Sequence, residues 1–262
     1  MTLDRSTPPA TAPLTYRPLP AVAQHHLKND LPVYTIQHGP MAVVEIAFHF
    51  YAGTVQAGKA GISGLVAKML SEGTRHHTAE QLATKLDDHG AEIEAKGERS
   101  LLTVALSAPT EALGEVLPLL AEVLFESEFP QPAYSLLINR MSESLKVNSQ
   151  RTKYHAQRAF LHKVFGPDHP LGMHLGPEEL KAVGINDLRG HYREFLTMNN
   201  AFVTVAGQFD EDDTLKQLQH FFGGTHLLTD PPKPRPTQAM TTAEAGRYDI
   251  ALPDKLQSTL RL

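Results

Sequence analysis

The sequence contains no cysteine, and it lacks the features of membrane-spanning and nucleic-acid-binding proteins. With no Cys among its 262 residues, it can form neither a disulfide nor a metal site made of thiolates. No stretch approaches the length of about 20 apolar residues that a membrane-spanning helix needs. The net charge is −5, and lysine and arginine do not cluster as a phosphate backbone requires. The composition therefore predicts no nucleic-acid partner and no membrane partner.

The common catalytic motifs are absent as well. There is no H-E-x-x-H, no G-x-S-x-G, no Walker loop and no Rossmann G-x-G-x-x-G. The 14 histidines give no convincing set of metal ligands. His155 and His162 are one heptad apart, too far to hold one ion, and His169 and His174 flank a loop. The adjacent pair His76-His77 is expected at the surface, and the sequence predicts no cofactor.

The first 20 residues are rich in proline, threonine and alanine and have no apolar core of a signal peptide. We expect an extended arm over residues 1–21. Without a visible targeting segment the compartment stays open, and the cytoplasm is the default expectation.

Hydrophobic residues make up 41% of the chain and charged residues 20%, an ordinary balance for a globular protein. Apolar residues recur with period two in some segments and with helical spacing in others. The pattern predicts an α+β fold, with a mainly antiparallel sheet and helices packed on one face. Expected strands are 25–27, 33–37, 41–52, 91–98, 99–108 and 201–209, and expected helices are 59–71, 78–88, 111–125, 131–150, 153–165, 178–183, 185–198 and 210–222.

The predicted helix Lys59–Ser71 is the most informative segment. Its apolar residues lie at helical spacing and mark a buried face: Ile62, Leu65, Val66, Met69 and Leu70. Small or polar residues fall on the opposite face: Gly64, Ala67, Lys68 and Ser71. This second face is therefore expected to be open, small and mildly cationic.

The run GISGLVAKMLSEGT, from Gly61 to Thr74, resembles the signature helix of the insulinase/pitrilysin metallopeptidases, a family that includes the mitochondrial processing peptidases. In that family the segment reads G-x-x-H-x-x-E-H-x-x-x-x-G-T. On this chain the two zinc-binding histidines fall on Gly64 and Lys68, and the general base Glu falls on Ala67. Gly and Ala offer no donor atom, and a Lys ammonium has no lone pair. The resemblance thus implies a zinc site that has been lost.

The family's third zinc ligand is a Glu on the helix that corresponds to 131–150. The resemblance places that ligand near Ser144–Lys146, where the nearest carboxylate is Glu143. One carboxylate does not make a zinc site. No zinc is therefore expected, and no catalytic residue is assigned.

The resemblance covers roughly residues 22–262. LKNDLPV resembles the family's opening hairpin, and AFVTVAGQFD resembles its later Gly-containing strand. We expect one peptidase-like domain over 22–222, followed by a Pro-rich linker over 223–246. KLQSTLRL resembles the first strand of a second homologous domain, so residues 247–262 are expected to begin such a domain and to stop inside it, with strand candidates at 247–252 and 254–262.

The resemblance implies a metal-free subunit that holds peptide and pairs with a zinc-bearing homologue for proteolysis, or forms a homodimer. Two alternatives stay open: a structural scaffold of the same fold, as in the respiratory-complex core subunits, and a metallopeptidase with a non-standard site. For peptide binding, the expected surface is a sheet edge near Arg99–Ala108, with Arg99, Leu101 and Thr103 as candidate contacts. The alternative is that this strand is covered within the sheet.

Overall fold

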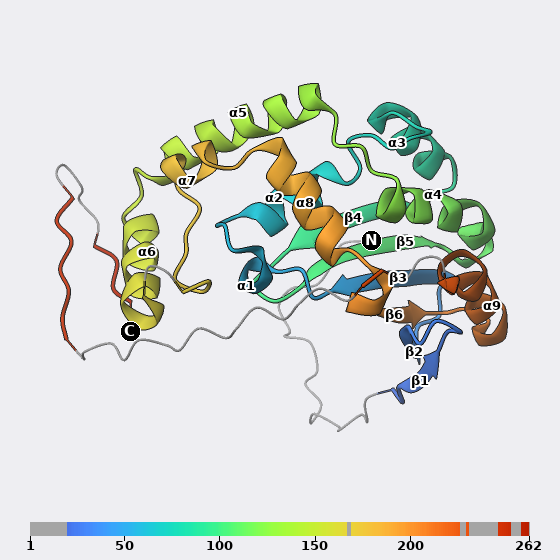
Figure 1. Cartoon of the computed structure of the whole chain (residues 1–262). Helices are drawn as coiled ribbons and strands as arrows, with labels where there is room; N and C mark the ends of the chain where they lie inside the picture. The colour runs from blue at the N-terminus through green and yellow to red at the C-terminus, as the bar shows by residue number, and fades with distance from the viewer. Residues whose placement is uncertain (1–19, 167–168, 226–228, 231–245, 253–257, 262) are drawn as a thin grey trace, which may run out of the picture.

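A six-stranded sheet forms the centre of the molecule (Figure 1). The structure is a computed structural model that describes residues 20–166, 169–225, 229–230, 246–252 and 258–261. Within this part of the chain the strand order is β1-β2-β6-β3-β5-β4. The strands are β1 (Ala23–His26), β2 (Pro32–Gln37), β3 (Val43–Phe50), β4 (Glu92–Gly97), β5 (Leu102–Pro109) and β6 (Ala201–Gly207). Neighbours are antiparallel except β2 and β6, which run parallel, so the expected mainly antiparallel sheet is confirmed.

The helices form close to where the sequence pattern predicts them. They are α1 (Thr54–Ala57), α2 (Ile62–Met69), α3 (Ala79–Asp88), α4 (Leu113–Phe125), α5 (Gln131–Asn148), α6 (Thr152–Phe165), α7 (Pro177–Lys181), α8 (Ile185–Phe195) and α9 (Glu211–Phe222). Thr78 caps α3 through a reciprocal capping box with Gln81, and Asp210 caps α9 by accepting from the Asp213 backbone N–H. α4 continues through Pro118.

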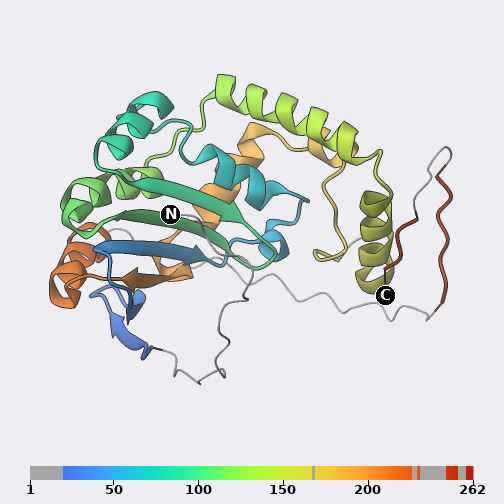
Figure 2. The same ribbon diagram turned by 180° about the vertical axis from the view of Figure 1, so that it is seen from behind.

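Helices cover one face of the sheet, with α2, α3 and α4 packed directly on its strands, whereas α6 lies apart from the sheet in both views (Figure 1, Figure 2). Along β3, Val44, Ile46, Phe48 and Phe50 are fully buried, while Glu45 between them is exposed, which is the period-two alternation of a sheet with one covered face. Seen from behind, the strands lie in front of the helices (Figure 2). The expected placement of helices on one face is confirmed.

β4 is an edge strand of the sheet, as β1 is at the other end. β5 lies between β3 and β4 and pairs with both, whereas β4 pairs with β5 alone among the described strands. The expectation of a sheet edge at Arg99–Ala108 is therefore wrong. The hairpin itself forms as predicted, but the long pairing of β3 with β5 places its second strand inside the sheet.

The C-terminal end of β4 touches the backbone of α2. A Cβ atom on Gly97 would lie 2.2 Å from the carbonyl carbon of Ser63 and 2.5 Å from the backbone nitrogen of Gly64. No side chain fits at that distance, so Gly97 allows the strand and the helix to meet. α2 also packs against α8 and β5, and these contacts fix its position beside the sheet edge.

The first hairpin is tied to the last helix of the domain. The buried Asn29 donates from its Nδ2 to the carbonyl of Phe222 at 2.8 Å, and β6 inserts between β2 and β3. Asn200, just before β6, donates to the carbonyls of Phe195 and Tyr51. Asn200 therefore has a structural role, because it joins the end of α8 and the end of β3 to the start of β6.

The expected arm (1–21) and linker (223–246) lie mostly outside the described residues, so the proposed domain boundaries stay predictions. Residues 246–252 and 258–261 are described, and neither stretch is a strand. The prediction of a strand at 247–252 is therefore wrong, because a strand requires a neighbouring strand to pair with. The strand predicted at 254–262 falls partly on residues outside the described ranges. In the part of the chain that has a described structure, no helix is both long and apolar enough to span a bilayer.

Candidate functional site

The candidate site is centred on α2, the helix that carries the family-like motif. Gly61 precedes it with φ of 76°, and a Cβ atom there would lie 2.6 Å from a Leu175 methyl group. Gly73, after the helix, has φ of 152°. Both motif glycines therefore occupy backbone conformations that other residues rarely adopt, which accounts for their presence without any metal.

The three motif positions lie in different surroundings. Gly64 is half-buried, Ala67 is buried and Lys68 is exposed. A Cβ atom at Gly64 would meet only the Gly97 carbonyl oxygen, at 3.9 Å, so there is room for a side chain at this position. Lys68 has no ion pair with any residue in the described ranges.

The prediction for the two faces of α2 is confirmed in one part and wrong in another. Ile62, Leu65, Val66, Met69 and Leu70 are all buried as expected. Ala67, expected on the open face, is 5% exposed and belongs to the core. The reason is that α2 is covered from two directions, by β4 and β5 of the sheet and by α8. Fewer residues of α2 are therefore exposed than the helical spacing of its apolar residues predicted.

α5 does not supply a carboxylate at the position of the family's third ligand. In the expected segment, Leu145 is the buried residue. Glu143 is exposed and its Oε1 lies 2.6 Å from the Nζ of Lys146, one turn away on the same helix. The one nearby carboxylate is therefore paired with a surface lysine.

These residues do not fit a zinc ion. Zinc takes imidazole, thiolate or carboxylate donors in a tetrahedral set, and the described residues contain no group of three or more His, Cys, Asp or Glu side chains that could hold a metal. The motif positions offer a hydrogen, a methyl group and an ammonium instead. Hydrolysis by a zinc-bound water has no support at this site.

A buried polar network holds the loop that follows α2. The Glu122 carboxylate of α4 accepts from Thr74 and lies 2.9 Å from Nδ1 of His77. Burial raises the pKa of Glu122, but the hydrogen bonds from Thr74 and His77 and the charges of His77 and His76 outweigh it and hold the pKa below its ordinary value. His77 was expected at the surface; it is instead largely buried against Glu122, whereas His76 is exposed.

The uncovered face of the sheet carries a small aromatic cluster around His49. Its ring stacks on Phe202 with centroids 4.7 Å apart, and its two nitrogens lie within hydrogen-bond distance of Thr103 and Thr204. Burial lowers the pKa of His49, against a smaller opposing effect of Glu45, which favours the neutral ring.

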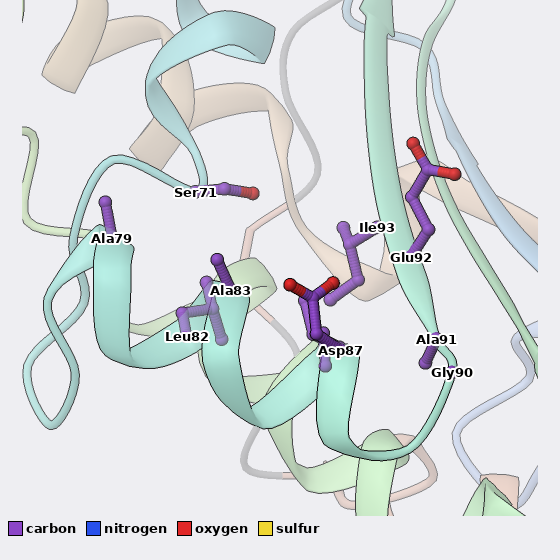
Figure 3. A pocket seen from close by; sticks show the side chains of 10 residues that line it. Ser71, Ala79, Leu82, Ala83, Asp87, Gly90, Ala91, Glu92 and Ile93 are labelled. Atoms are coloured by element: carbon purple, nitrogen blue, oxygen red, sulfur yellow. The ribbon is translucent and has the colours of Figure 1, made fainter.

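A groove of about 510 Å³ lies between α3, the end of α2 and the first residues of β4 (Figure 3). α3 contributes Leu82, Ala83 and Asp87, β4 contributes Glu92 and Ile93 after the turn at Gly90-Ala91, and Ser71 closes the side nearest α2. The groove therefore adjoins the open edge of the sheet. The groove could not be predicted from the sequence, because it forms only where α3 packs beside β4.

The residues expected to contact peptide are not on this edge. Arg99 and Leu101 lie in the turn between β4 and β5, where the Arg99 carbonyl accepts from the Val55 backbone N–H. Thr103 is inside the sheet on β5 and is paired with Lys96 of β4 and His49 of β3. The three residues therefore do not form one accessible strand edge.

The other histidines that the sequence singled out lie in separate surroundings. His155 Nε2 lies 2.7 Å from the Ser149 carbonyl, and His169 Nδ1 accepts from the Leu171 backbone N–H. Burial, with the nearby charge of Arg158, lowers the pKa of His174. They do not form a common ligand set.

Comparison with known proteins connects this geometry to a family. The family model described as insulinase (peptidase family M16) matches residues 33–176. A "non-peptidase homolog YmxG" from Helicobacter pylori is 23% identical over 182 residues, covering 69% of this chain and 42% of the relative. A "probable mitochondrial-processing peptidase subunit beta" from Schizosaccharomyces pombe is 22% identical, covering 78% of this chain and 46% of the relative. The chain thus spans less than half the length of these relatives.

Solved structures show the same fold. A peptidase M16 inactive domain from Pseudomonas fluorescens superposes with a TM-score of 0.76 at 17% identity, covering 86% of this chain and 55% of that one. A protease from Helicobacter pylori superposes with a TM-score of 0.72 at 18% identity, covering 83% of this chain and 54% of that one. Because the family model matches more than half of the sequence, the chain belongs to the insulinase family, peptidase family M16.

Proposed function

We propose that this chain is a non-catalytic, peptidase-like subunit that holds an extended peptide and pairs with a zinc-bearing homologue. One observation carries the non-catalytic part: α2 keeps its backbone and its core face but presents Gly64, Ala67 and Lys68 where zinc ligands and a general base are needed. Relatives described as a non-peptidase homolog and as an inactive domain support this proposal.

The proposed binding of peptide rests on the free edge of strand β4. No backbone hydrogen bond joins β4 to any described segment other than β5. An open strand edge offers unpaired N–H and C=O groups that a bound peptide pairs with by strand addition. The relevant segment is therefore Glu92–Gly97 rather than Arg99–Ala108.

Hydrogen exchange tests the peptide-holding role. Amides of Glu92–Gly97 are expected to gain protection when a saturating extended peptide is added, while the interior strand Leu102–Pro109 serves as an internal reference. If protection of residues 92–97 is the same with and without every peptide tried, the edge does not hold peptide.

The partner role is tested on the native protein. Untagged protein purified from its own cells is expected to elute with a homologue that carries an intact H-x-x-E-H motif, and to have no proteolytic activity once separated from it. Elution alone, or as a homodimer without an associated metallopeptidase, would replace this proposal with that of a structural scaffold.

The zinc content of the protein distinguishes a non-catalytic subunit or scaffold from a metallopeptidase with a non-standard site. The described residues offer no metal-binding group, so elemental analysis after dialysis is expected to find far less than one zinc per chain. Stoichiometric zinc would contradict the non-catalytic assignment.

A further inference from the structure

α6 stands apart from the sheet (Figure 1, Figure 2), and a loop that contains two histidines, described over 169–176, lies against it. The side-chain pairs that join α6 to this loop and to α7 include His174 with Tyr154, His169 with Phe165, and Glu179 with Arg158. The ring centroids are 4.8 Å apart in the first pair and 5.5 Å apart in the second. We call these pairs the α6 latch. Two of them use a histidine, so protonation of the loop bears on how firmly α6 is held.

His169 is held as a neutral ring. Its Nδ1 accepts a hydrogen bond from the backbone N–H of Leu171 at 3.1 Å, which requires a lone pair on that nitrogen. The imidazolium form carries a proton on both ring nitrogens and has no lone pair with which to accept. Protonation of His169 would therefore replace this hydrogen bond by a contact between two donors.

The surroundings of His174 also favour a neutral ring. Its Nε2 is buried and lacks a hydrogen-bond partner among the described residues. Charged and titratable groups face it from α6, from α7 and, across a shared cavity, from the turn before α2: Tyr154, Arg158, His162, Glu179 and Lys59. Burial lowers the pKa of His174 most, followed by the charge of Arg158; Glu179 opposes this effect and His162 adds to it.

The segment that forms the latch is already positively charged. Between Arg151 and Gly176 the sequence contains four Lys or Arg residues, four His and one Asp. The carboxylate of the latch, that of Glu179, is engaged by Arg158 and by the backbone N–H of Gly176 at 3.1 Å. Protonation of the loop histidines therefore adds charge of the same sign to a segment with little to neutralise it, and like charges in a partly buried contact repel each other.

The same loop rests on the start of α2. Leu175 follows His174, and a Cβ atom on Gly61 would lie 2.6 Å from one of its methyl groups, so the loop comes this close because position 61 is a glycine. Beside this contact, a cavity of about 380 Å³ is lined by His174 and Glu179 and by the turn 58–60, which gives water a place to enter. A change in the loop therefore reaches the first turn of the candidate-site helix.

We propose that the α6 latch is a pH-sensitive switch, closed while His169 and His174 are neutral and released when they are protonated, so that α6 and the start of α2 loosen together. The proposal does not depend on peptide binding or on a partner subunit. A released loop exposes both rings to water, where a histidine takes up its proton at about pH 6.5. Protons therefore bind the released state more readily, so the closed state is fully favoured above about pH 6.5 and is lost as the pH falls below that value.

Hydrogen exchange of the whole chain at pH 7.5 and pH 5.5 tests the switch. The results are compared as protection factors, which removes the intrinsic pH dependence of amide exchange. Peptides from α6, from 169–176 and from the start of α2 are expected to lose protection roughly tenfold at pH 5.5, the effect of one pKa unit. Peptides from β3 serve as the internal reference and are expected to stay within about twofold.

Two double variants that each remove two histidines separate the latch from general acid sensitivity. His169→Asn keeps an oxygen that accepts from the backbone N–H two residues on, and His174→Phe keeps an aromatic ring against Tyr154, but neither new side chain titrates. This double variant is expected to keep its α6 protection within about twofold between the two pH values. The matched control, His26→Gln with His38→Gln, removes exposed histidines of β1 and of the residue after β2, and should lose α6 protection as the unchanged protein does.

Three results would overturn the switch. They are equal α6 protection at both pH values in the unchanged protein, a loss at pH 5.5 that persists in the latch double variant, and a loss shared equally by β3, which means global acid unfolding. Circular dichroism melting curves at pH 7.5 show whether each variant is folded. If the latch double variant melts early, the single variants replace it, and each should remove part of the pH response; single variants that keep the full response overturn the proposal.

Discussion

Replacing Gly64 by alanine should stabilise the protein, whereas the same replacement at Gly97 should destabilise it strongly. The two glycines face each other where α2 meets β4. Their surroundings differ. A Cβ atom on Gly64 would have one neighbour, the Gly97 carbonyl oxygen at 3.9 Å, whereas a Cβ atom on Gly97 would lie 2.2–2.5 Å from the α2 backbone.

The magnitudes follow from these distances. Glycine inside a helix costs about 1 kcal/mol relative to alanine, and the contact at Gly64 is ordinary van der Waals separation, so Gly64→Ala should gain about that much. At Gly97 the helix backbone would have to move by about 1 Å to reach normal contact. Overpacking of this kind costs about 1–3 kcal/mol, and the upper end is expected because backbone atoms, not a flexible side chain, must shift.

Urea unfolding followed by circular dichroism measures both changes. For a domain of this size, 1 kcal/mol corresponds to about 2–4 °C in the melting temperature. If Gly64→Ala destabilises the protein, the space beside α2 is occupied or the helix is strained at this position, and Gly64 does not have free room for a methyl group. If Gly97→Ala is neutral, α2 does not rest on β4 as described.

Three further changes have definite expected outcomes. Gly64→His with Ala67→Glu and Lys68→His should bind no stoichiometric zinc by elemental analysis, because α5 offers no inward carboxylate and a Glu at buried position 67 is destabilising; retained zinc would contradict this. Glu122→Gln should cost about 2–3 kcal/mol at pH 7, through lost charge-assisted hydrogen bonds. The pKa of Glu122 in the folded protein lies below its ordinary value of 4.5, so the stability that the carboxylate contributes is complete above pH 4.5 and is lost as the pH falls through the folded pKa. The Glu122→Gln variant should therefore lose less stability on acidification than the unchanged protein. If both proteins lose stability equally with falling pH, the stabilising role of the Glu122 carboxylate is refuted. Thr78→Ala should cost about 1 kcal/mol in urea unfolding, since it removes one half of the capping box of α3; an unchanged midpoint would show that the cap is dispensable.

Local features of the fold were predictable because each is determined by neighbouring residues. The alternation in 41–52 identified β3, the spacing of Ile62, Leu65 and Met69 identified the buried side of α2, and Thr78 and Asp210 marked helix starts. The order of strands was not predictable in the same way. Whether β4 or β5 is the edge strand depends on which of them pairs with β3. That pairing depends on contacts between residues that are distant in the sequence.

The residue types at the candidate site could be predicted from the sequence, but the burial of each residue could not. The absence of zinc donors at positions 64, 67 and 68 can be read directly from the sequence. The burial of Ala67 could not, because elements distant in the sequence, β4, β5 and α8, pack around α2. His77 was also misplaced: adjacent histidines on a loop give no sign that one of them turns inward to a buried glutamate on another helix.

The insertion of β6 between β2 and β3 has a consequence for how the chain reaches its folded state. β2 and β3 are made early and lie close in sequence, yet they do not pair with each other; the strand that joins them is β6 (Ala201–Gly207). A nascent chain that ends before residue 201 would leave two apolar strand edges without their partner. Because contacts between distant parts of a chain form slowly, we expect the sheet to close late in synthesis, with the β1–β2 hairpin unattached and exposed to aggregation or chaperone binding until β6 is made.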